Sequence, residues 1–452
     1  ATVFTTGSAT ERNFGVAERV AAMPAPAPDG ALVSEREFDD YCVLRGEWSP
    51  PVFQEGTPPF FADADGGLIR LDGAGDPIVQ DTRTSPFYVT IPKAAMPAAG
   101  FPMYQYLHGT GGTANQVWER GRRDEMGVRE VGGGPARIAA GRGWAAASMG
   151  GWMSTEHLGD LLSLGGYIAY NFFNPRAMRD NFVQMASEYI LFRRLLETLT
   201  IPAALCPEAD ASAAPDGRFR FNAGLWTIAG HSQGSYNAGM VTALDLKPFQ
   251  GAVLPGAGGS WIQFALGPLD PPLSELLELL LDLEDDEHLD IWHPISTVFE
   301  LAAGSANNVH YLPSIFRAPR PGRTPPHMIV IQGYKDLQTT TNLQRPVSVA
   351  LGVDMVGPDA GPFPEGQILA DILLAGGRQL DYGTQNNRAV PGIGPRTVVT
   401  VRYEEDGILE GHSVPFQREE PKHQYGCFLE DLARGRAPII VEGVAEGGPC
   451  AP

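Results

Sequence analysis

A serine between glycines is the part of this chain best suited to do chemistry: residues 230–234 read Gly-His-Ser-Gln-Gly. The apolar run at 225–229 predicts a buried strand, and the small-residue segment at 235–244 predicts a closely packed helix. A residue on so sharp a strand-to-helix turn has a strained backbone, and glycine two positions to either side removes the clash of bulky side chains. The pattern therefore predicts that Ser232 is a nucleophile lifted clear of a sheet.

A serine hydroxyl is a poor nucleophile at neutral pH, so Ser232 requires a general base. The β-branched run at 397–403 predicts a strand, and an acidic loop after it leads to His412. We predict that His412 is the base. The alternative is His423, in a polar segment typical of a helix start. His231, beside the serine, is expected to shape the turn or pack against it.

The base in turn needs a carboxylate that holds its ring in the right tautomer. An apolar run at 327–332 predicts a third strand, and Asp336 follows shortly after its end. We predict that Asp336 is this acid, because the chain order serine, acid, histidine is the one that such a serine turn uses. The alternative interpretation is that Lys335 and Asp336 form a solvated turn.

Donors for a developing oxyanion are predicted upstream, where a strand-like run at 101–107 ends in His-Gly-Thr-Gly-Gly at 108–112. Glycines let backbone amides approach a small anion. The Thr110 amide is expected to pair with the Gln233 amide at the start of the helix, where the helix dipole also favours negative charge. An ordinary glycine turn is the alternative. His108 is expected to order this loop.

Together these motifs, over residues 86–440, resemble an α/β-hydrolase of the serine esterase and lipase type. Within that superfamily the chain is similar to the large bacterial extracellular lipases of the virulence-factor group, on the evidence of an Arg-Asp-Asn run inside residues 174–182. The resemblance implies that Ser232 is the nucleophile, His412 the base and Asp336 the acid. It also implies an oxyanion hole made by Thr110 and Gln233, and a reaction that needs no cofactor and no metal.

Alternating strand and helix signals after residue 86 predict an α/β fold, with a mostly parallel central sheet and helices on both faces. The clearest helix is expected at 175–199, where apolar residues recur at spacings of three and four. The segment between the strands at 250–254 and 327–332 is too long for a simple crossover. With its leucine-rich run at 273–283, it predicts an inserted helical cap at about 258–322, either buried in its own core or mobile as a lid.

We expect residues 1–85 to be an N-terminal extension packed on the core, and residues 86–452 to be the catalytic domain. The extension is rich in proline, as at 24–28, and is interpreted as extended irregular chain. Residues 63–67, Asp-Ala-Asp-Gly-Gly, resemble the start of a calcium loop. Ala74 stands where that loop needs a glutamate, so they are interpreted as an acidic turn.

Composition narrows the classes of partner. The 452 residues are 43% hydrophobic, enough for a large core, and carry a formal charge of −20. That charge argues against nucleic acid and disfavours docking to anionic membranes, and no apolar run is long enough for stable membrane insertion. The expected partner is a small-molecule, lipid or polymeric ester.

Four cysteines allow three pairings or four free thiols. A Cys427–Cys450 disulfide would hold the C-terminal tail, leaving Cys42 and Cys206 to hold the N-terminal region onto the core. Disulfides are favoured because the chain resembles an exported protein, secreted or periplasmic in a bacterium with its signal peptide removed. The predicted activity is ester hydrolysis through an acyl-serine. An acyltransferase, a serine peptidase and an inactive binding protein are the alternatives.

Overall fold

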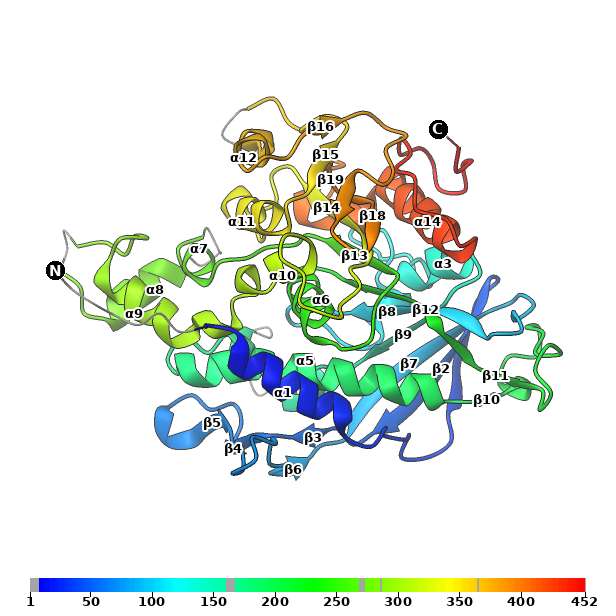
Figure 1. Ribbon diagram of the computed structural model, residues 1–452, viewed down its shortest axis with the longest axis horizontal. Coiled ribbons are helices and arrows are strands. Elements are labelled where there is room, and N and C mark those ends of the chain that lie inside the picture. Colours follow the sequence, from blue (N-terminus) through cyan, green and yellow to red (C-terminus); the bar gives the residue numbers. More distant parts are fainter. Residues whose placement is uncertain (1–7, 160–166, 268–272, 285–286, 364–365, 452) are drawn as a thin grey trace.

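The centre of the molecule is a twisted sheet that runs through most of its length (Figure 1). The computed structural model describes residues 8–159, 167–267, 273–284, 287–363 and 366–451. Within these residues the sheet has eleven strands, in the spatial order β1 (Val33–Glu37), β2 (Tyr41–Trp48), β7 (Ser85–Pro92), β9 (Ala145–Met149), β8 (Phe101–Leu107), β12 (Phe221–Gly230), β13 (Gly251–Pro255), β14 (His327–Gly333), β19 (Val398–Tyr403), β15 (Asp354–Val356) and β16 (Gln379–Leu380).

The sheet is parallel from β9 to β16 and antiparallel at the β1, β2 and β7 edge, which confirms the expected mostly parallel architecture. Its register brings the carboxyl ends of neighbouring strands to one edge. Gly230 at the end of β12 is level with Leu107 at the end of β8, and Gly333 of β14 is level with Tyr403 of β19. Loops that follow these strands therefore meet at the same edge.

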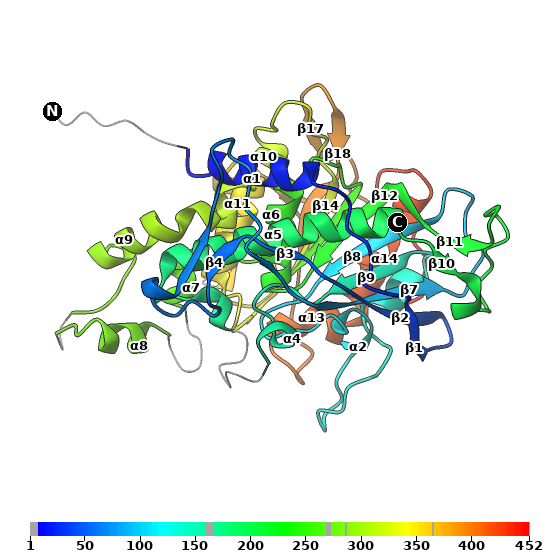
Figure 2. The same ribbon diagram turned by 90° about the horizontal axis from the view of Figure 1, so that it is seen from below.

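Both faces of the sheet are buried, so successive side chains of one strand enter different hydrophobic clusters. In β14, Met328 and Val330 join one cluster, whereas Ile329 and Ile331 join the other. The first face is covered by α1 (Glu11–Ala22), α5 (Pro175–Thr198) and α6 (Gln233–Leu244), and the second by α2 (Gln116–Glu119), α3 (Pro135–Ala140), α13 (Val414–Gln417) and α14 (Glu419–Ala433). Figure 2 shows α1 and α5 on one side of the sheet and α2 and α13 on the other.

The predicted cap is present between β13 and β14. Its helices are α7 (Trp261–Ala265), α8 (Leu273–Leu280), α9 (Pro294–Ala303) and α10 (Pro313–Phe316). In Figure 1, α8 and α9 project from one end of the molecule, whereas α10 lies close to α6. Among the described side chains of the leucine-rich run at 273–283, Leu279 is 77% exposed, so this run is not buried on every side.

The region before Pro86 differs from the irregular chain that was expected. It contains α1, the strands β1 and β2 of the main sheet, and two small antiparallel pairs, β3 (Pro51–Val52) with β6 (Asp81–Thr82) and β4 (Gln54–Gly56) with β5 (Gly66–Ile69). The prolines at 24–28 lie just after α1, so they end a helix that is already formed. Residues 63–65 form a short 3-10 turn, and Asp65 accepts a hydrogen bond from the Ala62 N–H at 2.8 Å.

The Arg-Asp-Asn run of α5 anchors this N-terminal region. Buried Asp180 accepts hydrogen bonds from Arg12 of α1 at 2.9 Å and from the Ile69 N–H of β5 at 2.9 Å. Asn181 accepts one from Gln54 of β4 at 3.0 Å. Three segments that precede the catalytic motifs are thus tied to one helix beside the sheet.

The structure contains both expected disulfides, Cys42–Cys206 and Cys427–Cys450. The first joins β2 to the segment after α5, and the second joins α14 to the C-terminal tail. Among the helices of the described ranges, none has the combination of length and apolar sequence that crossing a bilayer requires.

Candidate active site

Ser232 stands on a strained turn between β12 and α6. Its φ of 60° and ψ of −124° belong to a conformation that residues with side chains rarely adopt. A Cβ on Gly230 would lie 2.3 Å from the Gly234 backbone, and a Cβ on Gly234 would lie 2.0 Å from the Leu107 carbonyl oxygen. The two glycines are therefore required for the reason that the sequence suggested. The Ser232 N–H donates to the Pro255 carbonyl at 3.1 Å, which fixes the turn to the end of β13.

Asp336 and His412 form a buried pair at the same edge of the sheet. His412 Nδ1 lies 2.9 Å from Asp336 Oδ2, and the two residues are 2% and 5% exposed. The other carboxylate oxygen accepts the backbone N–H groups of Gln338 at 2.9 Å and Thr339 at 2.6 Å. Because an ionised carboxylate only accepts, His412 donates from Nδ1, which leaves Nε2 able to take a proton.

His231 connects the serine turn to the histidine loop. Its Nε2–H donates to the His412 carbonyl oxygen at 2.7 Å, and the two ring centroids are 4.4 Å apart. Burial lowers the pKa of His231 well below its usual value, with Arg120 and His412 acting in the same direction. The ring is therefore neutral and serves as a hydrogen-bond donor. This contact holds the Ser232 turn against the loop that carries His412.

The loop after β8 abuts Ser232 from the other side. A Cβ on Gly109 would lie 2.9 Å from the His231 carbonyl oxygen and 3.2 Å from Ser232 Cβ, so only glycine allows this approach. His108 orders the loop as expected: Nδ1–H donates to the Gly109 carbonyl at 3.0 Å, and Nε2 accepts the Gly151 N–H at 3.1 Å. Burial lowers the pKa of His108 to about 4, which keeps it neutral.

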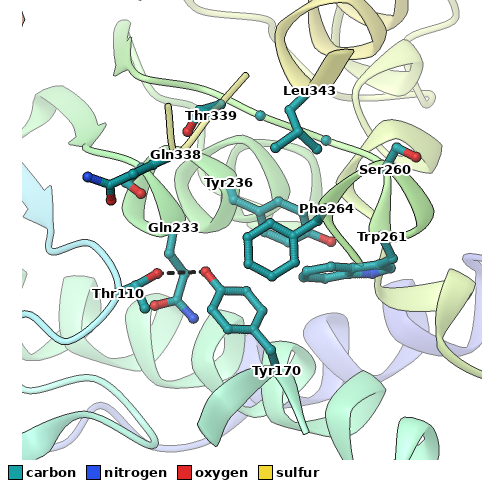
Figure 3. Close-up of a pocket in the computed structure, with 13 residues that line it drawn as sticks. Thr110, Tyr170, Gln233, Tyr236, Ser260, Trp261, Phe264, Gln338, Thr339 and Leu343 are labelled. Carbon is teal, nitrogen blue, oxygen red and sulfur yellow. Dashed lines mark hydrogen bonds between the residues drawn. The ribbon is translucent and has the colours of Figure 1, made fainter. Parts of the chain in front are cut away.

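The two residues that were predicted to supply amide donors lie together beside the serine. Gln233 opens α6, so its N–H is among those that no carbonyl within the helix accepts. Thr110 and Gln233 both line the cavity that contains Ser232, and Thr110 Oγ1 is hydrogen-bonded to the Tyr170 hydroxyl at 2.6 Å (Figure 3).

This cavity has about 530 Å³ of space and is partly open to solvent. Figure 3 shows aromatic side chains along one side and the polar Gln338 and Thr339 along another. The aromatic wall comes from four residues: Tyr170, Tyr236, Trp261 and Phe264. Two buried donors in the lining, Trp261 Nε1 and Gln233 Nε2, have no hydrogen-bond partner among the described residues. The cavity thus offers an apolar surface and polar groups close to one nucleophile.

Glu410 joins the two loops that carry Asp336 and His412. Its Oε2 accepts the N–H of His412 at 2.8 Å and the N–H of Leu337 at 3.0 Å. No sequence motif indicated Glu410, nor the cavity residues Tyr170, Tyr236 and Phe264. The one available signal for Glu410 was its position two residues before a candidate base. The aromatic residues lie in segments whose packing no local pattern specifies.

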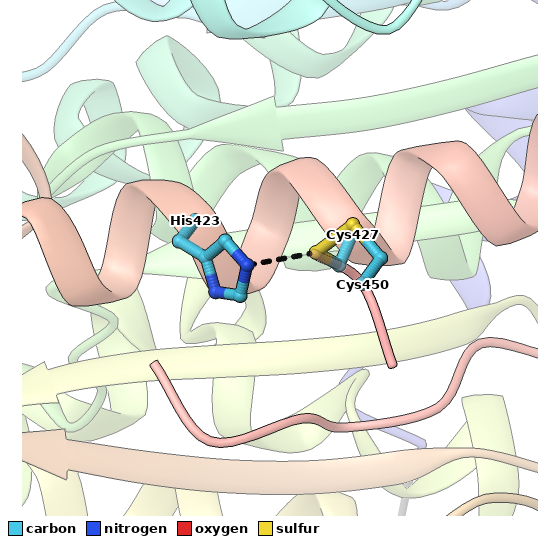
Figure 4. A group of neighbouring side chains, drawn as sticks. All are labelled: His423, Cys427 and Cys450. Atoms are coloured by element: carbon cyan, nitrogen blue, oxygen red, sulfur yellow. Dashed lines mark hydrogen bonds between the residues drawn. A yellow bond between two sulfur atoms is a disulfide. The ribbon is translucent and has the colours of Figure 1, made fainter. Parts of the chain in front are cut away.

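His423, the alternative base, lies away from this edge on α14. Its Nε2 is 3.4 Å from Cys427 Sγ, next to the Cys427–Cys450 disulfide (Figure 4). These three residues bring possible metal-ligand atoms within 4.8 Å of one another, but both sulfurs are bonded in the disulfide. His423 therefore packs against the structure that holds the C-terminal tail.

No protein-family model and no curated protein sequence matches this chain. Solved structures similar to it include an acetyl xylan esterase from Paenibacillus sp. R4, with 13% identity, a TM-score of 0.44, and coverage of 84% of this chain and 89% of that one. Another is a CE15 glucuronoyl esterase from Teredinibacter turnerae T7901, with 12% identity, a TM-score of 0.41, and coverage of 96% and 80%. A puromycin-hydrolyzing peptidase from Mycobacterium tuberculosis has 15% identity, a TM-score of 0.40, and coverage of 89% and 47%.

The class of fold follows from the molecule's own geometry. A mostly parallel sheet carries helices on both faces, and a strained serine stands on the turn from β12 to α6. An aspartate after β14 and a histidine after β19 come next in chain order. This is the α/β-hydrolase fold that the sequence motifs resemble.

Proposed function

We propose that this protein hydrolyses carboxylic esters through a covalent acyl-serine intermediate, with Ser232 as nucleophile, His412 as general base and Asp336 as the acid that orients it. The observation that carries the proposal is the buried His412–Asp336 hydrogen bond of 2.9 Å, at the sheet edge where Ser232 stands on its strained turn. Loops that follow β12, β14 and β19 carry these three residues at one edge of the sheet, which supports the proposal.

In the proposed reaction, Ser232 Oγ attacks the ester carbonyl carbon while His412 Nε2 takes the hydroxyl proton. The carbonyl electron pair moves to oxygen, and the amides of Thr110 and Gln233 donate to this oxyanion. Collapse of the tetrahedral intermediate breaks the bond to the alcohol, which leaves with the proton from His412. A water molecule then attacks the acyl-serine carbonyl in the same way, with His412 taking its proton, and the carboxylic acid and free Ser232 are released. Asp336 stabilises the His412 imidazolium during both acylation and deacylation.

The substrate we propose is an uncharged ester, small, lipid or polymeric. A formal charge of −20 gives the protein no general attraction for anionic polymers. Among the described residues that line the Ser232 cavity, four are aromatic and none is charged. Two disulfides support export to an oxidising compartment, either outside the cell or in a periplasm.

The test is the initial rate on p-nitrophenyl esters from acetate to palmitate. Replacing Ser232 with alanine is expected to lower kcat by at least about 10⁴-fold, because the acyl-enzyme cannot form. Ser212→Ala, at an exposed serine, is the matched control and should keep the wild-type rate. Equal turnover by Ser232→Ala would refute the mechanism, and a wild-type protein with no turnover would favour the binding-protein alternative. Faster cleavage of peptide amides, or acyl transfer to an added alcohol in preference to water, would point to the other two alternatives.

A further inference from the structure

A second cavity lies in the cap, between α7, α8 and α9, with about 500 Å³ of space that is partly open to solvent. Its lining is almost entirely hydrocarbon, and includes Phe172, Ile262, Leu277, Leu289, Ile295 and Phe299. Among the described residues of the lining, the one hydroxyl belongs to Ser296, and it already donates to the Asp290 carbonyl at 2.8 Å. A polar ligand would therefore lose its hydrogen bonds to water here and gain none in exchange. A hydrocarbon makes no such bonds in water, so it has none to lose.

The short helix α7 is the partition between this cap cavity and the Ser232 cavity. Trp261 and Phe264 line the Ser232 cavity, whereas Ile262 and Ala265 line the cap cavity. Opposite faces of this five-residue helix therefore line two different cavities.

A row of aromatic rings crosses this partition. The ring centroid of Tyr170, beside Thr110, is 4.6 Å from that of Phe264. Phe172 stacks on Phe264 at 6.1 Å and on Phe299 of the cap cavity at 5.3 Å. Phe264 lines the Ser232 cavity and Phe172 lines the cap cavity, so a chain that extends from one space into the other has to pass this stacked pair.

We propose that the cap cavity is the distal site for an acyl chain whose carbonyl lies at Ser232. The ligand is the hydrocarbon end of an unbranched fatty acyl group, which reaches the cap cavity past Phe264 and Phe172. This inference rests on the proposed ester hydrolysis and specifies its substrate class: esters of medium-chain or longer fatty acids rather than of acetate alone. Its physical basis is the transfer of methylene groups from water to an apolar cavity with no polar group left unsatisfied.

The test fills the cap cavity without touching the Ser232 cavity. In Ala265→Trp, an indole would occupy space that the acyl chain needs, so kcat/KM for p-nitrophenyl decanoate is expected to fall at least about tenfold. The value for p-nitrophenyl acetate should stay within about twofold, because acetate does not reach past Phe264. Leu301→Trp adds an indole on α9 at a side chain that is 86% exposed, and as the matched control it should leave both values unchanged.

The outcomes separate the two proposals. Loss of turnover on both esters by a folded Ala265→Trp protein, or undiminished decanoate turnover, would overturn the cap site. So would a wild-type protein that hydrolyses acetate but not decanoate. Wild-type protein with no turnover on any ester would instead overturn the ester hydrolysis itself.

If Ala265→Trp does not fold, a crystal structure of wild-type protein inhibited by p-nitrophenyl decylphosphonate decides the matter. This reagent bonds to the nucleophilic serine with loss of p-nitrophenol and leaves the decyl chain in place. A chain within the cap cavity would support the proposal, and a chain elsewhere would refute it.

Discussion

His231 is a neutral ring that holds the loop of the proposed base. Its Nε2–H donates to the His412 backbone carbonyl, while its ring lies edge-on to Phe416, with 4.7 Å between the centroids. His231 is not among the described residues that line the Ser232 cavity. We therefore predict that His231 acts on catalysis through the orientation of His412.

Replacing His231 with phenylalanine should keep the ring packing but remove the donor to His412. We expect kcat to fall by about 10- to 100-fold, because a misplaced base loses alignment with the serine, while KM for p-nitrophenyl butyrate changes little. His231→Gln, which keeps a side-chain N–H, should recover part of the loss. A fall in thermal stability with kcat unchanged, or a rise in KM alone, would contradict a positioning role.

At the scale of elements, the site depends on how closely backbone segments approach. The serine turn lies against the end of β8, and Glu410 ties the loop after β14 to the loop after β19. Where backbones meet this closely, even one added methyl group has no space, because protein interiors are already close-packed.

A pair of matched substitutions tests this requirement. Gly234→Ala would place a Cβ 2.0 Å from the Leu107 carbonyl oxygen, whereas a Cβ on Gly15 of α1 has no atom within 4 Å. We expect Gly234→Ala to displace the turn, lowering stability by about 1–3 kcal/mol and ester turnover severely. Gly15→Ala should raise stability by about 0.5–1 kcal/mol, since alanine favours a helix, and leave turnover unchanged. Urea unfolding and initial rates on both variants provide the measurement. Equal behaviour of the two would show that the close approach at Gly234 is unimportant.

At the scale of the whole molecule, two disulfides close loops of very different length. Cys42–Cys206 spans 164 positions and links the N-terminal strands to the body of the fold, whereas Cys427–Cys450 spans 23 and holds the tail. A cross-link stabilises a protein mainly by restricting its unfolded chain, more so for a longer loop.

Removing the two disulfides separately should therefore have unequal effects. The chain-entropy relation gives a loss of about 5 kcal/mol for the Cys42→Ala, Cys206→Ala variant and about 3 kcal/mol for the Cys427→Ala, Cys450→Ala variant. Guanidinium unfolding of each double variant measures these losses. A larger loss from the tail disulfide would show that native packing of the tail, with His423 against it, outweighs loop closure.

Buried neutral histidines should make the whole fold sensitive to acid. Burial lowers the pKa of His108 and of His327 to about 4, from a usual value near 6.5. Below pH 6.5 the unfolded chain binds protons that the folded protein does not, so the free energy of unfolding should decrease as pH falls from 6.5 towards 4.

His327 is the better position for testing this sensitivity, because it lies at the start of β14, away from the catalytic edge. His327→Asn keeps an acceptor for the Thr397 N–H, which His327 Nδ1 accepts at 3.0 Å, but removes the titration. The slope of unfolding free energy against pH should become shallower by up to about 1.4 kcal/mol per pH unit between these limits. An unchanged slope would mean that the ring is already protonated in the folded protein.

Local patterns were enough to locate the serine turn, the strands that carry Asp336 and His412, and the helix at 175–198, because strand and helix periodicity are local properties. They failed for residues before Pro86. There, β1 reads Val-Ser-Glu-Arg-Glu and all five side chains are exposed, so its place in the sheet comes from pairing with β2 rather than from apolar alternation. The helix α1 was obscured by the prolines that follow it.

The sequence by itself determined which residue types follow which strands, and hence the order of the proposed nucleophile, acid and base along the chain. Tertiary structure decided what those residues touch. It placed His412 against Asp336 and His423 against Cys427, set His231 against a carbonyl 181 positions away, and formed one of three cysteine pairings. It also formed a cap cavity from leucines whose local pattern predicts only a helix. The physical reason is that periodicity is set by neighbours in the chain, whereas contacts between loops and between cap helices depend on long-range packing that no short stretch encodes.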